Sequence, residues 1–157
     1  MYIGGGLWVV NISDPAKPFE AGACNTPGIA VRVCVRDTRA YVADQSGGLR
    51  VIDVSKPAEP HEVGCYNQAD DVVGVDVVDT RVYLADGGSG LRVVDVSHLA
   101  SPMEVGTYAS AGYVESVDVF GEYVCLANGI DGLCIIDVAD PRQPVAVSFL
   151  DMPGWIS

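Results

Sequence analysis

Oxygen-bearing side chains in the short loops of this 157-residue chain are its strongest candidates for chemistry. Carboxylate and amide oxygens are the ligands that Ca2+ takes in proteins, and a surface rich in carboxylates also attracts basic partners. The sequence therefore offers two hypotheses, a Ca2+ site or a docking surface for a basic protein or a glycan. The candidate surface comprises Asp44, Asp70, Asp71, Asp86, Asn128 and Asp131.

Three of these residues, Asp44, Asp86 and Asn128, follow one another at intervals of 42 residues. Aspartate and asparagine favour tight turns because their side chains accept hydrogen bonds from nearby backbone N–H groups. For these three residues we favour that structural role over ligand binding. The pair Asp70-Asp71 is less bound to the repeat and more suggestive of a site, but no loop carries the alternating aspartates of an EF-hand. We assign no metal ligand and no cofactor-binding residue.

Two other sets of aspartates lie within predicted strands. Asp53, Asp95 and Asp137 occupy one repeated position, where we expect them to accept hydrogen bonds within their own unit. Asp76 and Asp118 lie on the first strand of their units. We expect these two to point into a central channel or into a contact between units, with a solvated channel as the simpler explanation.

The sequence carries no catalytic signature. It contains no G-x-S-x-G, H-E-x-x-H or P-loop motif, and His61 and His98 are not paired with a nucleophile. We therefore assign no catalytic residue and predict a non-enzymatic protein. The five cysteines form no C-x-x-C pair, and we expect them to be small buried side chains. Cys125 and Cys134 fall on neighbouring strands of a predicted hairpin, which permits a disulfide without indicating one.

Charge and hydropathy exclude two classes of partner. The net charge is −12, from 21 acidic and 9 basic side chains, and such a surface repels the phosphate backbone of nucleic acids. No run approaches the roughly eighteen consecutive apolar residues of a membrane helix, so we expect no membrane insertion. The first ten residues lack the basic region and cleavage site of a signal peptide.

The elements that position these residues follow a repeat of 42 residues. The pair Gly-Leu recurs at Gly6, Gly48, Gly90 and Gly132, and a proline follows each glycine after twelve residues. One unit contains four short segments, at residues 72–79, 81–86, 91–97 and 103–108, separated by turn signals, and the first of them is rich in valine. They are too short for helices, and four antiparallel strands repeated at this interval predict an all-β fold of β-propeller blades. Apolar residues at both odd and even positions indicate strands that are buried on both faces.

The repeated segments resemble a known family. The stretches GLRVIDVSKPAEPHEVGCY, GLRVVDVSHLASPMEVGTY and GLCIIDVADPRQPVAVSFL, together with YVADQSG, YLADGGSG and CLANGIDG, are similar to the LVIVD repeat. The resemblance covers nearly the whole chain, with departures at Asn11 and at His98-Leu99. It implies a β-propeller of the kind found in bacterial and archaeal surface or secreted proteins, and hence an extracellular or cell-surface location. It implies no catalytic residues.

The phase of the repeat predicts a single propeller domain with three complete blades, at residues 28–68, 70–110 and 112–151. A fourth blade is split between residues 1–27 and residues 152–157. One chain could close as a four-bladed ring, two chains could exchange termini in an eight-bladed homodimer, or the chain could be a piece of a longer array. We favour the dimer, because four blades is the lower limit of the architecture and forces a wide angle between blades.

The sequence therefore leads to three functional hypotheses. The first is a non-enzymatic propeller scaffold that binds a protein or a glycan, as part of a cell-surface assembly. The second is a cation-dependent hydrolase or lactonase with a metal ion at the axial mouth of the acidic face, which requires several oxygen ligands to converge. The third is a purely structural spacer.

Overall fold

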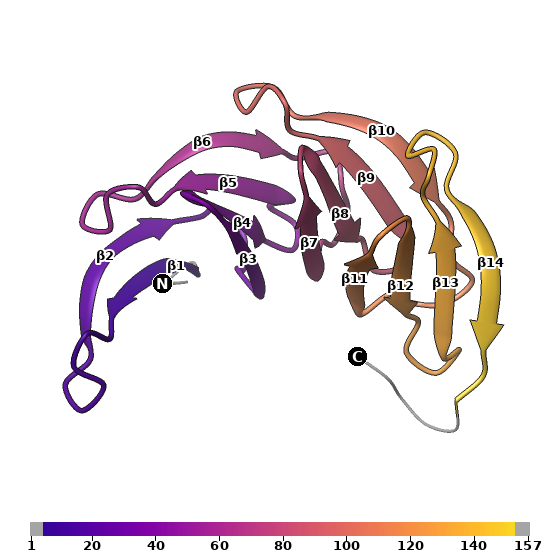
Figure 1. The fold of residues 1–157 in the computed structure, drawn as a ribbon, viewed down its shortest axis with the longest axis horizontal. Coiled ribbons are helices and arrows are strands. Elements are labelled where there is room, and N and C mark those ends of the chain that lie inside the picture. Colours follow the sequence, from indigo (N-terminus) through magenta and orange to yellow (C-terminus); the bar gives the residue numbers. More distant parts are fainter. Residues whose placement is uncertain (1–4, 153–157) are drawn as a thin grey trace.

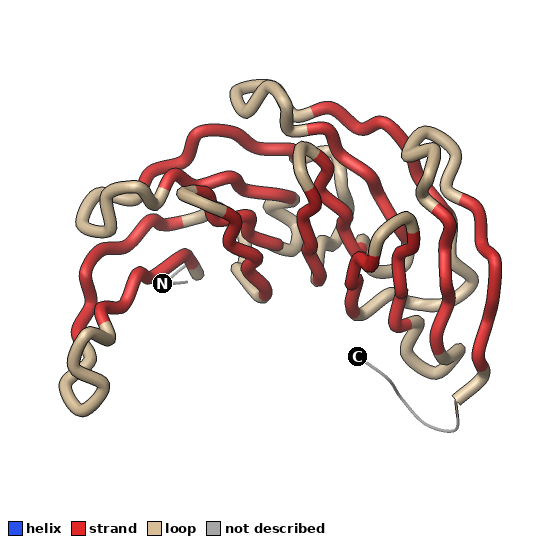
Figure 2. The backbone as a smooth tube through the Cα atoms, in the orientation of Figure 1, coloured by secondary structure: helices blue, strands red, loops and turns tan. Residues whose placement is uncertain are grey.

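A computed structural model describes residues 5–152 of the chain. Within these residues, fourteen strands form one two-stranded sheet and three four-stranded sheets, and all neighbouring strands are antiparallel. Strands and loops account for the whole of this part of the chain, which contains no helix (Figure 2). The predicted all-β fold of four-stranded blades is confirmed.

Each sheet follows the order of the chain, so within a sheet every strand pairs with the next one through a hairpin or a short loop. The half-blade consists of β1 (Gly6–Asn11) and β2 (Phe19–Asn25). Blade 1 consists of β3 (Arg32–Arg36), β4 (Arg39–Ala43), β5 (Leu49–Asp53) and β6 (His61–Tyr66). Blade 2 consists of β7 (Gly74–Val78), β8 (Arg81–Ala85), β9 (Leu91–Asp95) and β10 (Met103–Tyr108). Blade 3 consists of β11 (Ser116–Phe120), β12 (Tyr123–Ala127), β13 (Leu133–Asp137) and β14 (Val145–Leu150).

The sheets are arranged as an open arc (Figure 1). Strands β3, β7 and β11 line the concave side, and β6, β10 and β14 form the outer rim. The half-blade and blade 3 lie at opposite ends of the arc, separated by the open side. Apart from Asp151 and Met152, the segment after β14 lies outside the described residues, and so does most of the predicted contribution of residues 152–157 to the split blade.

The hydrophobic core is divided into layers between successive sheets. One apolar cluster joins the half-blade to blade 1, a second joins blades 1 and 2, and a third joins blades 2 and 3. Blade 2 takes part in two of them: Val82 and Leu84 pack toward blade 1, whereas Tyr83 and Ala85 pack toward blade 3. Successive residues of a strand point to opposite faces, so a strand covered on both sides is apolar at every position. This confirms the interpretation drawn from the mixed apolar pattern.

Two sets of glycines recur in the repeat because the backbone needs them at those positions. Gly48, Gly90 and Gly132 have φ angles of 76°, 91° and 80°, a left-handed conformation that side chains with a Cβ rarely adopt. A second set lies on the last strand of a sheet, where the next blade approaches closely. A Cβ on Gly64 would collide with the carbonyl oxygen of Leu99 in blade 2, and Gly22 and Gly106 face the next blade in the same way.

The predicted strands of blade 2 are correct in number and order but too long by up to three residues. The first begins at Gly74 rather than residue 72, because Val72 pairs with Gln45 in an isolated bridge to blade 1. All five cysteines are free. Cys125 pairs with Ile135 and Cys134 pairs with Leu126, so the two cysteines point to opposite faces of the sheet and form no disulfide.

Candidate functional site

Asp44, Asp86 and Asn128 occupy equivalent buried positions just after β4, β8 and β12. The Asp44 carboxylate accepts hydrogen bonds from the Thr26 hydroxyl at 2.5 Å and from the Gly28 N–H at 2.8 Å. Both donors belong to the connection that leads into blade 1. Asp44 therefore ties the turn between β4 and β5 to this connection, which is a structural role.

The equivalent residues repeat this arrangement in the other blades. Asp86 accepts hydrogen bonds from the backbone N–H groups of Asp70 and Asp71, at 2.9 and 2.7 Å. Asn128 accepts one from the Ser110 hydroxyl at 2.9 Å. Each side chain holds the loop that joins two successive sheets, so the repeated position fixes the path of the chain from blade to blade.

The other three residues of the predicted surface lie closer to solvent. The Asp70 carboxylate accepts a hydrogen bond from Ser89 at 2.9 Å, and the Asp71 carboxylate accepts one from the Tyr113 hydroxyl at 2.6 Å. Asp131 is exposed. Within residues 5–152, no group of three or more His, Cys, Asp or Glu side chains is arranged to hold a metal ion. The structure thus divides the six predicted residues into three buried and three outer ones and does not bring them to one point.

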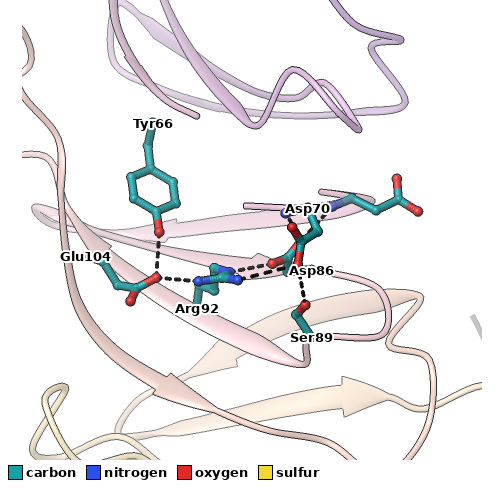
Figure 3. Close-up of polar contacts among 7 residues, drawn as sticks. Tyr66, Asp70, Asp86, Ser89, Arg92 and Glu104 are labelled. Carbon is teal, nitrogen blue, oxygen red and sulfur yellow. Dashed lines mark hydrogen bonds and ion pairs between the residues drawn. The ribbon is translucent and has the colours of Figure 1, made fainter. Parts of the chain in front are cut away.

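Two arginines that sequence reasoning missed neutralise the buried aspartates. Arg92 on β9 contacts the Asp86 carboxylate and lies 2.8 Å from the Glu104 carboxylate (Figure 3). In blade 1, Arg50 on β5 lies 3.7 Å from Asp44 and donates a hydrogen bond to the carbonyl of Gly47. Each arginine follows its aspartate by six residues, and this repeated spacing is the feature of the sequence that could have indicated the pairing.

The cluster around Arg92 also crosses the contact between blades 1 and 2. The Tyr66 hydroxyl of blade 1 donates a hydrogen bond to the Glu104 carboxylate of blade 2 at 2.5 Å (Figure 3). Burial, together with this carboxylate acceptor, raises the pKa of Tyr66 to about 12. Burial opposes the charge of Arg92, but its hydrogen bonds with Asp86 and Glu104 prevail and raise its pKa. Arg92 is therefore charged and Tyr66 neutral over the ordinary pH range.

A second tyrosine continues the polar contacts toward blade 3. The hydrogen bond to Asp71 and, to a smaller extent, burial raise the pKa of Tyr113 to about 12. Tyr113 lies in the connection that leads into blade 3, where the next residue, Val114, forms a bridge with Gly87. Polar contacts on this side of the arc thus run from blade 1 through blade 2 to the start of blade 3.

The aspartates that end β5, β9 and β13 accept hydrogen bonds within their own blades, as the sequence predicted. Asp53, Asp95 and Asp137 accept from the backbone N–H two residues later, at 2.8, 2.7 and 2.9 Å. In blades 1 and 2 an arginine also pairs with the aspartate, Arg39 with Asp53 and Arg81 with Asp95, both at 2.7 Å. The hydrogen bonds from Ser55 and Ser97, more than these ion pairs, lower the pKa of Asp53 and Asp95.

The concave side of the arc contains a polar hollow of about 480 Å3 that spans all three inner strands. Asp76 lies within it and joins the three strands. Its carboxylate is 3.1 Å from the Arg36 guanidinium on β3 and accepts a hydrogen bond from the Val119 N–H on β11 at 2.9 Å. We expected Asp76 to point either into a central channel or into a contact between blades. Its side chain does both, because it lines the concave hollow and contacts the neighbouring blades. The lining residues are Arg32, Val33, Cys34, Val35, Arg36, Val75, Asp76, Ser116, Val117 and Asp118.

The charges of the hollow are separated. Arg32 and Arg36 come from β3 at one side, whereas Ser116 and Asp118 come from β11 at the other. Arg32 makes no side-chain hydrogen bond or ion pair within residues 5–152, and its guanidinium is available to a ligand. An extended polar ligand can therefore meet a positive group at one end of the hollow and a negative group at the other.

Antiparallel four-stranded sheets that stack face to face around a concave side are blades of a β-propeller, and this chain is a protein of that class. A family model described as the LVIVD repeat matches residues 1–26, 27–68, 70–110 and 111–151. The chain belongs to the LVIVD-repeat family, as the repeated motifs indicated. A search of curated proteins found no match. Within residues 5–152 there is no helix long and apolar enough to cross a membrane.

Proposed function

We propose that this chain is a non-enzymatic scaffold that binds a segment of a partner protein in the concave hollow. The observation that carries this proposal is the hollow itself, which combines about 480 Å3 of volume with charged groups from three blades. Binding sites are typically concave and present a few polar groups that fix the orientation of the ligand. The resemblance to surface-type repeats supports a role for this binding in a cell-surface assembly.

The charge distribution favours a peptide segment over a neutral glycan. Arg32 and Arg36 match a carboxylate, and Asp118 matches an ammonium or guanidinium group. A peptide with side chains of both signs satisfies both ends of the hollow. A neutral sugar chain satisfies neither charge fully and leaves desolvated charged groups without a partner.

Three aspartates, Asp44, Asp76 and Asp86, hold the strands and loops around the hollow in place in the absence of a ligand. Asp76 holds β3, β7 and β11 together directly, and Asp44 and Asp86 fix the loops that lead into blades 1 and 2. A preformed site loses less conformational entropy on binding than a flexible one. This rigidity supports a recognition role and requires no chemical step.

A displayed library of random peptides provides the test. The chain is used for selection, and the selected peptides are measured by calorimetry against the wild type, Arg32→Ala and Lys56→Ala. We expect Arg32→Ala to weaken binding about tenfold or more, the effect of about 1.4 kcal/mol. Lys56 is an exposed lysine outside the hollow, so Lys56→Ala is the matched control and should bind as the wild type does.

Three results would contradict the proposal. Equal affinity of Arg32→Ala and the wild type would place the peptides elsewhere. Failure to select any peptide, together with binding to a glycan array that depends on Arg32, would replace the protein segment by a glycan. Cleavage or modification of a selected peptide by the chain, detected by mass spectrometry, would overturn the non-enzymatic role.

A further inference from the structure

A second hollow, of about 300 Å3, lies at the junction of blades 2 and 3 and shares no lining residue with the concave hollow. We call it the rim hollow, because it borders β10, which belongs to the outer rim of the arc (Figure 1). Both neighbouring blades are complete four-stranded sheets. The lining residues come from the end of β9, the loop after it, β10 and the loop between β13 and β14, and they are Asp95, Ser97, His98, Ser101, Met103, Val105 and Arg142.

Arg142 breaks the repeat at its position. The equivalent residues of the three preceding units are all alanine, at Ala16, Ala58 and Ala100. Arg142 is exposed, and its backbone N–H donates to the Asp140 carboxylate at 3.0 Å. Its side chain makes no hydrogen bond or ion pair within residues 5–152. A guanidinium therefore lines this hollow without a partner from the described part of the chain.

The loop that carries Arg142 lies close against β10. A Cβ on Gly106 would collide with the carbonyl oxygen of Pro141, so the glycine permits this approach. Met103 and Val105 of the same strand both line the hollow. Val105 packs against the apolar cluster between blades 2 and 3, whereas Met103 is 65% exposed. The close approach therefore places a guanidinium beside an apolar surface.

The loop between β9 and β10 supplies further hydrogen-bonding groups. The Ser97 hydroxyl lies 3.2 Å from Nδ1 of His98, and Nε2 of the ring makes no hydrogen bond within residues 5–152. The Ser101 hydroxyl makes none there either, although the backbone N–H of Ser101 donates to the His98 carbonyl at 2.9 Å. Together with Arg142, these side chains form a set of N–H and O–H donors from two loops. Such a set suits the oxygens of an anion.

The carboxylate in the rim hollow has both oxygens engaged. Oδ1 of Asp95 accepts a hydrogen bond from the Ser97 N–H at 2.7 Å, and Oδ2 lies 2.7 Å from the Arg81 guanidinium. Asp95 therefore offers a cation no free oxygen. Arg81 and Arg142 outnumber Asp95, so the local charge favours an anion over a cation.

The equivalent positions at the junction of blades 1 and 2 lack this chemistry. Ala100 takes the place of the arginine, and Glu59 takes the place of Ser101. Lys56 lies 3.8 Å from Glu59, so the cation of this loop is already paired. The donor set of the rim hollow is therefore a property of one junction and not of the repeat.

We propose that the rim hollow binds a small organic oxyanion, a carboxylate or a phosphate that is attached to an apolar group. The forked guanidinium of Arg142 matches two oxygens of such an anion, and Ser101 and His98 complete the donor set. Met103 and Val105 provide the surface for the apolar group. A hollow of about 300 Å3 lies at the lower end of the sizes that hold small molecules. This site does not depend on the peptide binding proposed above.

Amide NMR of the isotopically labelled full chain tests the site, with phenyl phosphate and benzoate as probes. We expect the signals of residues 95–106 and 139–143 to shift, and the tighter of the two probes identifies the anion. Arg142→Ala should weaken binding of that probe about tenfold or more, because it removes a charge-assisted pair. This variant copies Ala100, so the loop should keep its fold. Lys56→Ala removes an exposed lysine from the equivalent loop of blade 1 and is the matched control, with unchanged affinity.

Two further comparisons separate the charged half of the site from the apolar half. Inorganic phosphate and benzyl alcohol each carry one half of a probe, and both should bind about tenfold or more weakly than the tighter probe. Met103→Gln should weaken binding of the tighter probe by about threefold and leave the binding of inorganic phosphate unchanged.

The proposal fails if neither probe binds, if Arg142→Ala binds as the wild type does, or if benzyl alcohol binds as tightly as the probes. It also fails if the shifts are confined to the concave hollow, at residues 32–36 and 116–118. Arg32→Ala distinguishes the two hollows, because it removes an arginine from the concave hollow and leaves the rim hollow intact. Unchanged affinity in Arg32→Ala supports the rim hollow, and a tenfold loss there would assign the anion to the concave side.

Discussion

The two junctions between complete blades solve the same packing problem with different chemistry. The junction of blades 1 and 2 carries a salt-bridged cluster of acidic and basic side chains around the buried Asp86, whereas the junction of blades 2 and 3 has uncharged residue types at the same repeat positions. The tyrosine that projects from the preceding blade is present in both, as Tyr66 and Tyr108. In blade 2 the three positions are Asp86, Arg92 and Glu104, and in blade 3 they are Asn128, Cys134 and Ala146.

The charges are therefore not what holds successive blades together. The apolar layers are equivalent at the two junctions, with Leu49 and Val51 fully buried at one and Leu91 and Val93 at the other. Burying a set of charges costs desolvation that their mutual attraction offsets only when all partners are present. The cluster is therefore replaceable as a whole, as blade 3 shows, but sensitive to the loss of any one member.

The largest effect is expected from removing the central arginine. Arg92→Met leaves the buried Asp86 carboxylate without its cation, and we expect a loss of about 3–5 kcal/mol in the free energy of unfolding. Urea denaturation followed by circular dichroism measures it. Cys134→Ala at the same position of the neutral junction should cost only about 1 kcal/mol, and equal losses in the two variants would remove the distinction between the junctions.

A smaller effect is expected where the two blades approach most closely. Gly64→Ala places a Cβ against the carbonyl of Leu99, and we expect a loss of about 1–3 kcal/mol in the unfolding free energy. Gly88→Ala is the control, because a Cβ on Gly88 meets nothing within 4 Å. If both substitutions had the same small effect in thermal and urea unfolding, close approach at the junction would not limit stability.

A triple substitution that copies the neutral junction should be nearly silent. Asp86→Asn, Arg92→Cys and Glu104→Ala together remove the whole cluster and leave no unpaired charge. We expect an unfolding free energy within about 1 kcal/mol of the wild type, well above that of Arg92→Met alone. Urea denaturation of the two variants side by side measures the difference. A triple variant as unstable as the single one would show that the charges are needed by this junction.

The smallest effect is confined to alkaline pH. Tyr66 has a folded-state pKa of about 12, above its ordinary value of 10.0, so its neutral form stabilises the fold fully below pH 10. This contribution is lost as the pH rises from 10 toward 12. Tyr66→Phe should flatten the decline of unfolding free energy over that range, measured by urea denaturation between pH 9 and 11.5. An unchanged slope would show that the Tyr66 hydroxyl does not sense its carboxylate acceptor.

The sequence predicted the repeated parts of the molecule better than the particular ones. The aspartates at the ends of the third strands, such as Asp53 and Asp95, were assigned hydrogen bonds within the blade, and they make them. The pairing of Arg50 and Arg92 with buried aspartates was missed. Asp44 and Arg50 are close in the sequence, but only the hairpin between β4 and β5 shows that their side chains share one face.

The blades, their number of strands and the apolar layers between them follow from the 42-residue repeat alone. Strand length, alternation and turn glycines are local properties, and each is written several times in this chain. Whether a copy of a repeated position lies in a charged junction, a neutral junction or the concave hollow depends instead on the folded arrangement of the sheets. These outcomes depend on which sheet lies opposite, and a side chain's neighbour across a junction is about one repeat away along the chain.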